Sequence, residues 1–458
     1  MQTRRGFLAT GLSVAANSGS IRLLADEDDG SGFQRAVRTG RDTLNVKVLM
    51  PRNRVPLSFV IDDSTCLVNM GHFCTPQFAE ALPNRAEYKK RWRDWPREIP
   101  DEFVRRFGEW CVERGVRGKY SIVPYPACVG WVDREMPGWS RQQLQESLKL
   151  VRELMVPNWD IHPEMITHTR VIDLKTGRPK EAINAGTMEN SYPQEKKSVD
   201  ELAAYLAYAL RILERCDLPC EGITTPGGFG NLVKSELSLA VDQAVRDVYR
   251  VDLPHYFKYV RTGDQSTEPL LEHVRGAGTE DARLTVNVPA GTGDWFGGWQ
   301  GDRVPDADRY CNEDATSGRM VELIERHQPA IMLCHWPGIY SNGTEAGFRA
   351  FQRIVTSLNA RYRDQTLWMK LSEIGRYWAA KDLTVLNRVG KQITLDAPFN
   401  VNEFTLRVAK VSGSARLDSK LNQVAKMSAL TAGTWFQSGQ DQIVCFNLAK
   451  GRNLLQWN

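Results

Sequence analysis

The chain lacks several features that would place it in other classes of protein. It has no apolar run long enough to span a bilayer, no extended basic block, no low-complexity tract and no evident internal repeat. Its nine cysteines are an odd number and include no C-x-x-C spacing, which argues against a zinc knuckle and against a dense disulfide framework. These absences disfavour a membrane-spanning protein, a nucleic-acid-binding protein and a small disulfide-rich scaffold.

The first 25 residues have the pattern of a targeting segment. Twin arginines, Arg4 and Arg5, precede a short, weakly apolar stretch, and Leu23-Leu24-Ala25 before an acidic run fits a cleavage site. The segment resembles a bacterial twin-arginine export signal, which implies a periplasmic or secreted protein that is free of the membrane after cleavage. A basic disordered tail is the alternative. Cleavage would remove three arginines and lower the formal net charge from +4 to +1, which leaves no electrostatic reason to expect a nucleic-acid partner.

About 430 residues remain, enough for one large and one small domain. Between about 55 and 380, short apolar runs alternate with amphipathic stretches typical of helices, of which 198–216 has the clearest period. This alternation predicts an α/β fold, namely a (β/α)7–8 barrel over residues 51–381 that follows a flexible lead-in at 26–50. A doubly wound sheet is the alternative. Residues 382–458 show period-two runs instead, which predict a small C-terminal β-sandwich. We expect it to pack structurally on the barrel, carbohydrate binding being the alternative.

Two adjacent carboxylates, Asp62 and Asp63, follow a short apolar run that begins at Ser58. At the C-terminal end of a barrel strand, both side chains can face one cleft. One carboxylate could then bind a cation while the other accepts a proton. An Asx-type turn is the structural alternative.

A second group of polar residues lies between Asp160 and Thr169, where His162, Glu164 and His168 occupy seven residues after another predicted strand. Asp63 together with two of these three would suit a divalent ion, either Zn²⁺ or a harder ion such as Mn²⁺, Fe²⁺ or Co²⁺. Such an ion can lower the pKa of its water to about 7 and polarise a carbonyl oxygen. Each histidine could instead be a core or surface residue.

At these positions the chain resembles the polysaccharide deacetylase family of the glycoside hydrolase/deacetylase barrel superfamily. The segment Phe59 to Ser64 is similar to the family pattern Thr-Phe-Asp-Asp-Gly, with Ser64 in place of glycine. The resemblance covers residues 55 to about 380 and rests more on motif order than on motif identity. It implies that Asp62 is the general base and Asp63 a metal ligand.

The remaining motifs depart from the family pattern in part. The family's second motif has histidines at its fifth and ninth positions, which are Glu164 and His168 here, so Glu164 would replace one imidazole and His162 is an alternative ligand. The family's Arg-Pro-Pro element is replaced by a segment that begins at Thr225, which removes the arginine that would orient the base. The segment ending in Leu-Cys-His335 matches the late motif that supplies the general acid. An unperturbed imidazole pKa near 6.5 suits that role. The alternative is that His335 is a structural residue at the end of a strand.

A glycine-rich loop over residues 291–300 presents Trp295 and Trp299, whose flat faces suit sugar rings. Core packing is the alternative for either one. Thr225 and Glu373 follow two further predicted strands. Together with the two tryptophans, they are expected to line a substrate site on one rim of the barrel.

These observations predict an exported, metal-dependent hydrolase that removes an acyl group, most simply acetyl, from an amino sugar. A glycoside hydrolase on the same barrel, using Asp62 or Asp294 with Glu373, is one alternative. A carbohydrate-binding relative that has lost its metal and its catalysis is the other.

Overall fold

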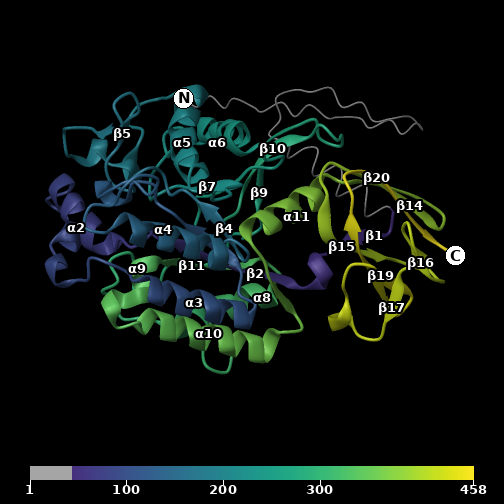
Figure 1. Cartoon of the computed structure of the whole chain (residues 1–458). Helices are drawn as coiled ribbons and strands as arrows, with labels where there is room; N and C mark the ends of the chain where they lie inside the picture. The colour runs from purple at the N-terminus through teal and green to yellow at the C-terminus, as the bar shows by residue number, and fades with distance from the viewer. Residues whose placement is uncertain (1–43) are drawn as a thin grey trace, which may run out of the picture.

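The computed structural model describes residues 44–458, and Figure 1 shows their arrangement. The predicted export signal at residues 1–25 lies outside the described residues. Within the described part, no helix combines the length and the apolar character needed to cross a bilayer.

The helices and strands are named in chain order. The helices are α2 (Met70–Ala81), α3 (Asp101–Arg114), α4 (Arg141–Leu150), α5 (Val199–Glu214), α6 (Lys234–Tyr249), α7 (Ala307–Tyr310), α8 (Arg319–Glu325), α9 (Trp336–Tyr340), α10 (Ala346–Tyr362) and α11 (Leu371–Leu383). The strands up to α11 are β1 (Val46–Val48), β2 (Val55–Asp62), β3 (Gly118–Ser121), β4 (Trp159–His162), β5 (Ile172–Asp173), β6 (Arg178–Pro179), β7 (Gly222–Thr224), β8 (His255–Phe257), β9 (Leu270–Arg275), β10 (Arg283–Asn287), β11 (Ala330–His335) and β12 (Thr366–Trp368). The later strands are β13 (Val385–Val389), β14 (Gln392–Ala397), β15 (Val401–Val408), β16 (Ala415–Arg416), β17 (Asn422–Val424), β18 (Thr434–Ser438), β19 (Asp441–Leu448) and β20 (Gly451–Trp457).

The alternating region forms two mainly parallel sheets. One has the order β11-β2-β3-β4, with β12 added on β2, and the other has the order β7-β8-β10-β9. A single bridge between Glu164 and Thr224 links the sheets on one side, and one hydrogen bond of 2.8 Å from the Gly291 amide to the Ile331 carbonyl links them on the other. The α/β class is as predicted, but the strand ladder is not continuous around a closed barrel. Strand β7, which borders the first of these seams, has only three residues, and it meets the segment after β4 at that one bridge.

Helices cover the outside of these sheets. In Figure 1, α5 and α6 lie on one side of the strands and α3 and α10 on the opposite side. The predicted helix at 198–216 is observed as α5, and its capping box is confirmed, because the Ser198 hydroxyl accepts from the Glu201 amide while the Glu201 side chain accepts from the Ser198 amide. Helix α2 was not predicted, since it contains Pro76 and has no strong apolar period.

The C-terminal residues form two sheets, β1-β15-β19-β18-β17 and β13-β14-β20-β16. Strand β1 corrects the predicted lead-in, because residues 46–48 pair antiparallel with β15 and are not a free linker. One buried apolar cluster joins both sheets to α11 and to the interior face of the parallel strands. Helix α11 lies between the two parts of the molecule in Figure 1. Its Tyr377 hydroxyl donates to the Leu49 carbonyl at 2.8 Å and accepts from the Thr405 amide at 3.2 Å.

Candidate metal and catalytic centre

Three strand ends bring the predicted motifs together at the carboxyl end of the β11-β2-β3-β4 sheet. Asp62 is the last residue of β2, and His335, the last residue of β11, is its partner in the parallel ladder. Glu164 lies two residues beyond β4, whose His162 pairs with Ser121 at the end of β3. Because all four strands run in the same direction, their final residues meet at one edge.

Asp63, Glu164 and His168 form the candidate metal centre. The His168 Nε2 atom lies 2.7 Å from Asp63 Oδ1 and 3.4 Å from Glu164 Oε1, and the Asp63 amide donates to Glu164 Oε2 at 2.7 Å. One ligand atom from each residue lies within 4.8 Å of the others. The three residues that motif order selected are thus side by side, and Glu164 occupies the position where the family pattern has an imidazole.

The chemistry of this set fits a divalent cation. Asp63 is 1% exposed, and apart from the contact with His168 neither of its carboxylate oxygens has a hydrogen-bond partner. Buried carboxylate oxygens normally accept hydrogen bonds or coordinate a metal. Asp63 also adopts a left-handed backbone with φ of 57°, an unfavourable conformation that is concentrated at functional sites. Two carboxylates and an imidazole would hold an ion such as Zn²⁺, Mn²⁺, Fe²⁺ or Co²⁺.

Without an ion, His168 supplies the positive charge that these carboxylates need. Burial alone would lower its pKa, but the charge of Asp63 and the hydrogen bonds with Asp63 and Glu164 raise the pKa of His168 well above its ordinary value. In the same way, burial would raise the pKa of Glu164, but its hydrogen bond to His168 and the charge of His168 lower it. Asp63 and Glu164 therefore favour the protonated form of His168.

Asp62 is oriented by a buried lysine. Lys119 on β3 is completely buried and pairs with the Asp62 carboxylate, and its Nζ also donates to the Ile61 carbonyl at 2.9 Å and to the Ser121 hydroxyl at 2.8 Å. Burial and the nearby charge of Glu164 raise the pKa of Asp62 to about 7, although Lys119 opposes the shift. A carboxylate that titrates near neutral pH suits a general base. Lys119 thus holds the Asp62 side chain in place, and the sequence patterns did not reveal it because it comes from a different strand.

His335 is held by Asp294. The sequence had suggested Asp294 only as a carboxylate of a glycoside hydrolase. The Asp294 Oδ2 atom lies 2.7 Å from His335 Nδ1 and accepts from the His335 amide at 3.2 Å. Burial would lower the pKa of His335, but the hydrogen bond to Asp294 and the charges of Asp63, Asp294 and Asp62 raise it to about 9. The pair fixes the ring and leaves Nε2 as the donor available for proton transfer.

Trp299 is connected to this centre through Phe78. Trp295 comes earlier in the same loop. The Trp299 ring packs edge-on against Phe78, with 5.5 Å between centroids, and Phe78 lies 6.4 Å from the His168 ring. Trp295 packs on Tyr310 at 4.8 Å, with the guanidinium of Arg309 over its ring. Both tryptophans are partly exposed.

Three predicted site residues take no part in this set. His162 points into the interior, where its Nε2 is 2.9 Å from His255 Nε2. Thr225 directly follows Thr224, the bridge partner of Glu164, and is buried, with its hydroxyl donating to the Phe257 carbonyl. Glu373 pairs with Arg117, which precedes β3, at the amino end of the sheet. It is at that end because β12 pairs only with Val55 to Leu57 of β2 and therefore stops far short of Asp62. A glycosidase pair of Asp62 or Asp294 with Glu373 is thus not assembled.

The interior histidines belong to a second cluster with Asp160, and its ligand atoms are also within 4.8 Å of one another. Its polar atoms, however, are largely satisfied. Asp160 accepts from the Ser372 amide at 2.7 Å and from the Ser372 hydroxyl at 2.8 Å, and the two imidazoles bond to each other. The Asp63 carboxylate contacts only His168, and this makes Asp63, Glu164 and His168 the better candidate for an ion.

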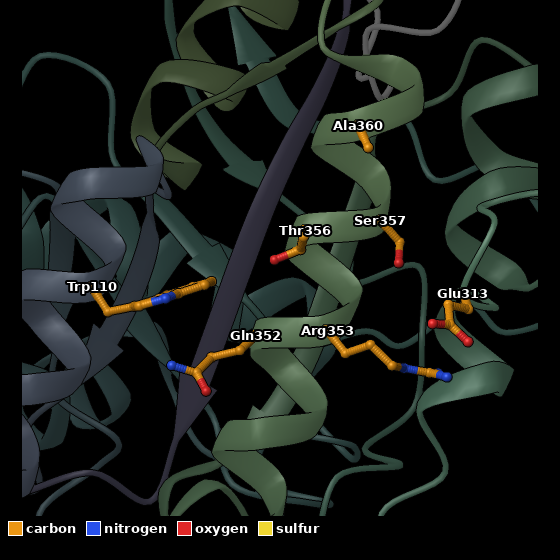
Figure 2. Close-up of a pocket in the computed structure, with 7 residues that line it drawn as sticks. All are labelled: Trp110, Glu313, Gln352, Arg353, Thr356, Ser357 and Ala360. Carbon is orange, nitrogen blue, oxygen red and sulfur yellow. The ribbon is translucent and has the colours of Figure 1, made fainter.

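Neither candidate cluster lines the hollow shown in Figure 2, which has a volume of about 510 Å³. Trp110 of α3 lies on one side of α10 and Glu313 on the other, and the α10 residues between them are mostly small or polar. Arg353, the basic residue of this hollow, is paired with Asp308 at 2.6 Å. We therefore assign the chemistry to the strand ends and not to this groove.

Comparison with known proteins finds only distant likenesses. No protein-family model matches the chain, and no curated protein matches it. Among solved structures, the chain is similar to a mutant CE4 family pseudoenzyme with restored enzymatic activity, at 13% identity over 72% of this chain and 70% of that chain, with a TM-score of 0.28. A protein described as a glycoside hydrolase/deacetylase, from Parabacteroides distasonis, is 10% identical over 79% and 82% of the two chains, with a TM-score of 0.36. The Thermotoga maritima α-fucosidase is 10% identical over 89% and 97%, with a TM-score of 0.29. Likenesses this weak carry no argument about activity.

Proposed function

We propose that this protein is a metal-dependent hydrolase that removes an acyl group from an amino sugar. The observation that carries the proposal is the meeting of Asp62, Asp63, the Glu164–His168 pair and His335 at one sheet edge. This arrangement combines a ligand set, a base and an acid in the order of the deacetylase motifs. An ion held by Asp63, Glu164 and His168 would supply Lewis-acid polarisation of an acyl oxygen and would acidify water.

The side chains account for the proton transfers of an amide hydrolysis. Asp62 takes a proton from the attacking water while the water oxygen bonds to the acyl carbon. The bond from that carbon to nitrogen then breaks, and His335 gives its proton to the departing nitrogen. The products are a carboxylic acid and a free amine, and Asp62 and His335 return to their starting states by exchanging one proton with solvent.

The proton states of the two groups support these roles. In the metal-free protein, the pKa of Asp62 is raised to about 7 by burial, and the pKa of His335 is raised to about 9 by Asp294. Between these values the carboxyl is ionised and the imidazole is protonated, as a base and an acid require. Lys119 and Asp294 keep the two side chains in place.

The aromatic loop supports a saccharide as the substrate class. Trp299 and Trp295 are partly exposed and could stack on the apolar faces of sugar rings. We also propose export to the periplasm or beyond, on the basis of the twin-arginine segment at residues 1–25.

The test is release of acetate from N-acetylglucosamine oligomers by the chain loaded with Zn²⁺ or Co²⁺. Asp62→Asn and His335→Gln should each lower turnover by about 10²-fold or more, while Glu373→Gln, at the far end of the sheet, should retain it. Loss of activity in Glu373→Gln together with release of new reducing ends would identify a glycoside hydrolase. If the chain bound no metal and hydrolysed no N-acylated oligomer, the hypothesis of a non-catalytic carbohydrate-binding protein would remain.

A further inference from the structure

The loop after β4, residues 163–169, has an unfavourable backbone. Met165 and His168 both adopt the left-handed conformation, with φ of 53° and 63°. Non-glycine residues in this region cost about 1 kcal/mol or more each and persist only where surrounding contacts enforce them. Since the loop carries both Glu164 and His168, whatever enforces its shape also determines whether their side chains converge.

Glu189 provides the enforcing contacts. It is fully buried, and its carboxylate accepts four hydrogen bonds, two on each oxygen. Oε1 accepts from the Ile166 amide at 3.1 Å and from the Tyr205 hydroxyl at 2.5 Å. Oε2 accepts from the Thr167 amide at 3.0 Å and from the His168 amide at 2.6 Å.

The loop is also attached to Glu189 through the main chain, because the Glu189 amide donates to the Thr169 carbonyl at 2.6 Å. Tyr205 comes from α5, a long helix packed in the core, and its hydroxyl also accepts from the Ile172 amide at 3.2 Å. The carboxylate is thus anchored on one side by a rigid helix and holds three consecutive loop amides on the other.

We propose that Glu189 is a positioning residue of the candidate metal centre, which holds the 163–169 loop so that Glu164 and His168 face Asp63. This inference rests on the proposed function, since it assigns Glu189 a role in metal affinity. The two carboxyl oxygens of Glu189 together offer acceptor sites for all four donors. A glutamine would direct its amide N–H groups at one pair of these donors and leave that side of the loop unsupported.

The experiment compares Zn²⁺ binding, measured by titration calorimetry on the full chain, in the wild-type protein, in Glu189→Gln and in Tyr205→Phe. We expect Zn²⁺ affinity to fall by about 10- to 100-fold in Glu189→Gln, as for other residues that orient metal ligands, and by a smaller factor in Tyr205→Phe. Asp101→Asn is the control, because it replaces a carboxylate that accepts a hydrogen bond from the Ser147 hydroxyl at 2.7 Å and belongs to neither candidate metal cluster. Its Zn²⁺ affinity should equal that of the wild type even where its stability is lower.

Amide hydrogen exchange separates this inference from the proposed function. In the metal-free protein, Glu189→Gln should speed the exchange of Ile166, Thr167 and His168 amides relative to the rest of the chain. A folded Glu189→Gln protein with wild-type Zn²⁺ affinity, or with unchanged exchange at these amides, would overturn the assignment of Glu189. A wild-type protein that binds no Zn²⁺, Mn²⁺ or Co²⁺ would instead remove the proposed function and with it the metal-positioning role.

Discussion

Replacement of Lys119 by methionine gives a direct test of the buried charge pair that orients Asp62. Methionine keeps much of the length of the side chain but removes its charge. Three acceptors lose their donor: the Asp62 carboxylate, the Ile61 carbonyl and the Ser121 hydroxyl. The Asp62 side chain is 8% exposed, so water cannot replace the ammonium group.

The size of the effect follows from this burial. Removing one partner of a buried pair typically costs about 3–5 kcal/mol, because the remaining charge is left uncompensated. For Lys119→Met we therefore expect a loss of about 3 kcal/mol in the free energy of unfolding at pH 8. A variant of an exposed pair, Lys197→Met beside Glu195, should lose far less stability, because solvent screens that pair.

The pH dependence gives the sign of the effect. Asp62 has a folded pKa raised to about 7 by burial, above an unfolded value of about 3.9, so the folded state binds its proton more tightly and stability falls as pH rises between these values. Without Lys119 the folded pKa of Asp62 rises further, so the loss of folding stability with rising pH continues to a higher pH. The deficit of Lys119→Met should therefore shrink as pH is lowered toward 5, and adding Asp62→Asn should restore much of the lost stability at pH 8.

Urea unfolding of the wild-type and variant chains at pH 5 and pH 8, followed by circular dichroism, measures these differences. If Lys119→Met matched the Lys197→Met control at pH 8, or if its deficit were the same at both pH values, the buried ion pair and the account of the base would be wrong.

The other predictions concern the acid, the metal and the C-terminal sheets. Asp294→Asn should lower the pKa of His335 from about 9 toward 6.5, because it removes the carboxylate that stabilises the imidazolium; an NMR titration with an unchanged pKa would contradict this. Zn²⁺ binding near pH 7 should release about one proton and tighten as pH rises, because a ligating His168 must lose the proton that Asp63 stabilises; calorimetric heats independent of buffer ionisation enthalpy would show otherwise. A chain that ends at residue 383 should be less soluble and less heat-stable, because it loses β15, the partner of β1, and uncovers the apolar face of α11; a truncated chain as stable as the whole would refute this.

Local pattern was enough to predict much of the fold and part of the site. The apolar run before Asp62, the capping box of α5 and the period-two strands after α11 are features of neighbouring residues, and such features determine where strands and helices form. Motif order likewise selected Asp63, Glu164 and His168 as a candidate set, because side chains on two strand ends need only the right sequence order and direction to converge.

The tertiary structure decided what depends on register and on contacts through space. The register of β11 on β2 places His335 opposite Asp62, while the short pairing of β12 leaves Glu373 at the other end. No spacing in the sequence relates Lys119 to Asp62 or Glu189 to the loop of His168, since each pair meets only after separate strands and helices have packed. Hydrogen-bond register and buried charge pairing are satisfied globally, so these positioning residues became visible only when the chain was folded.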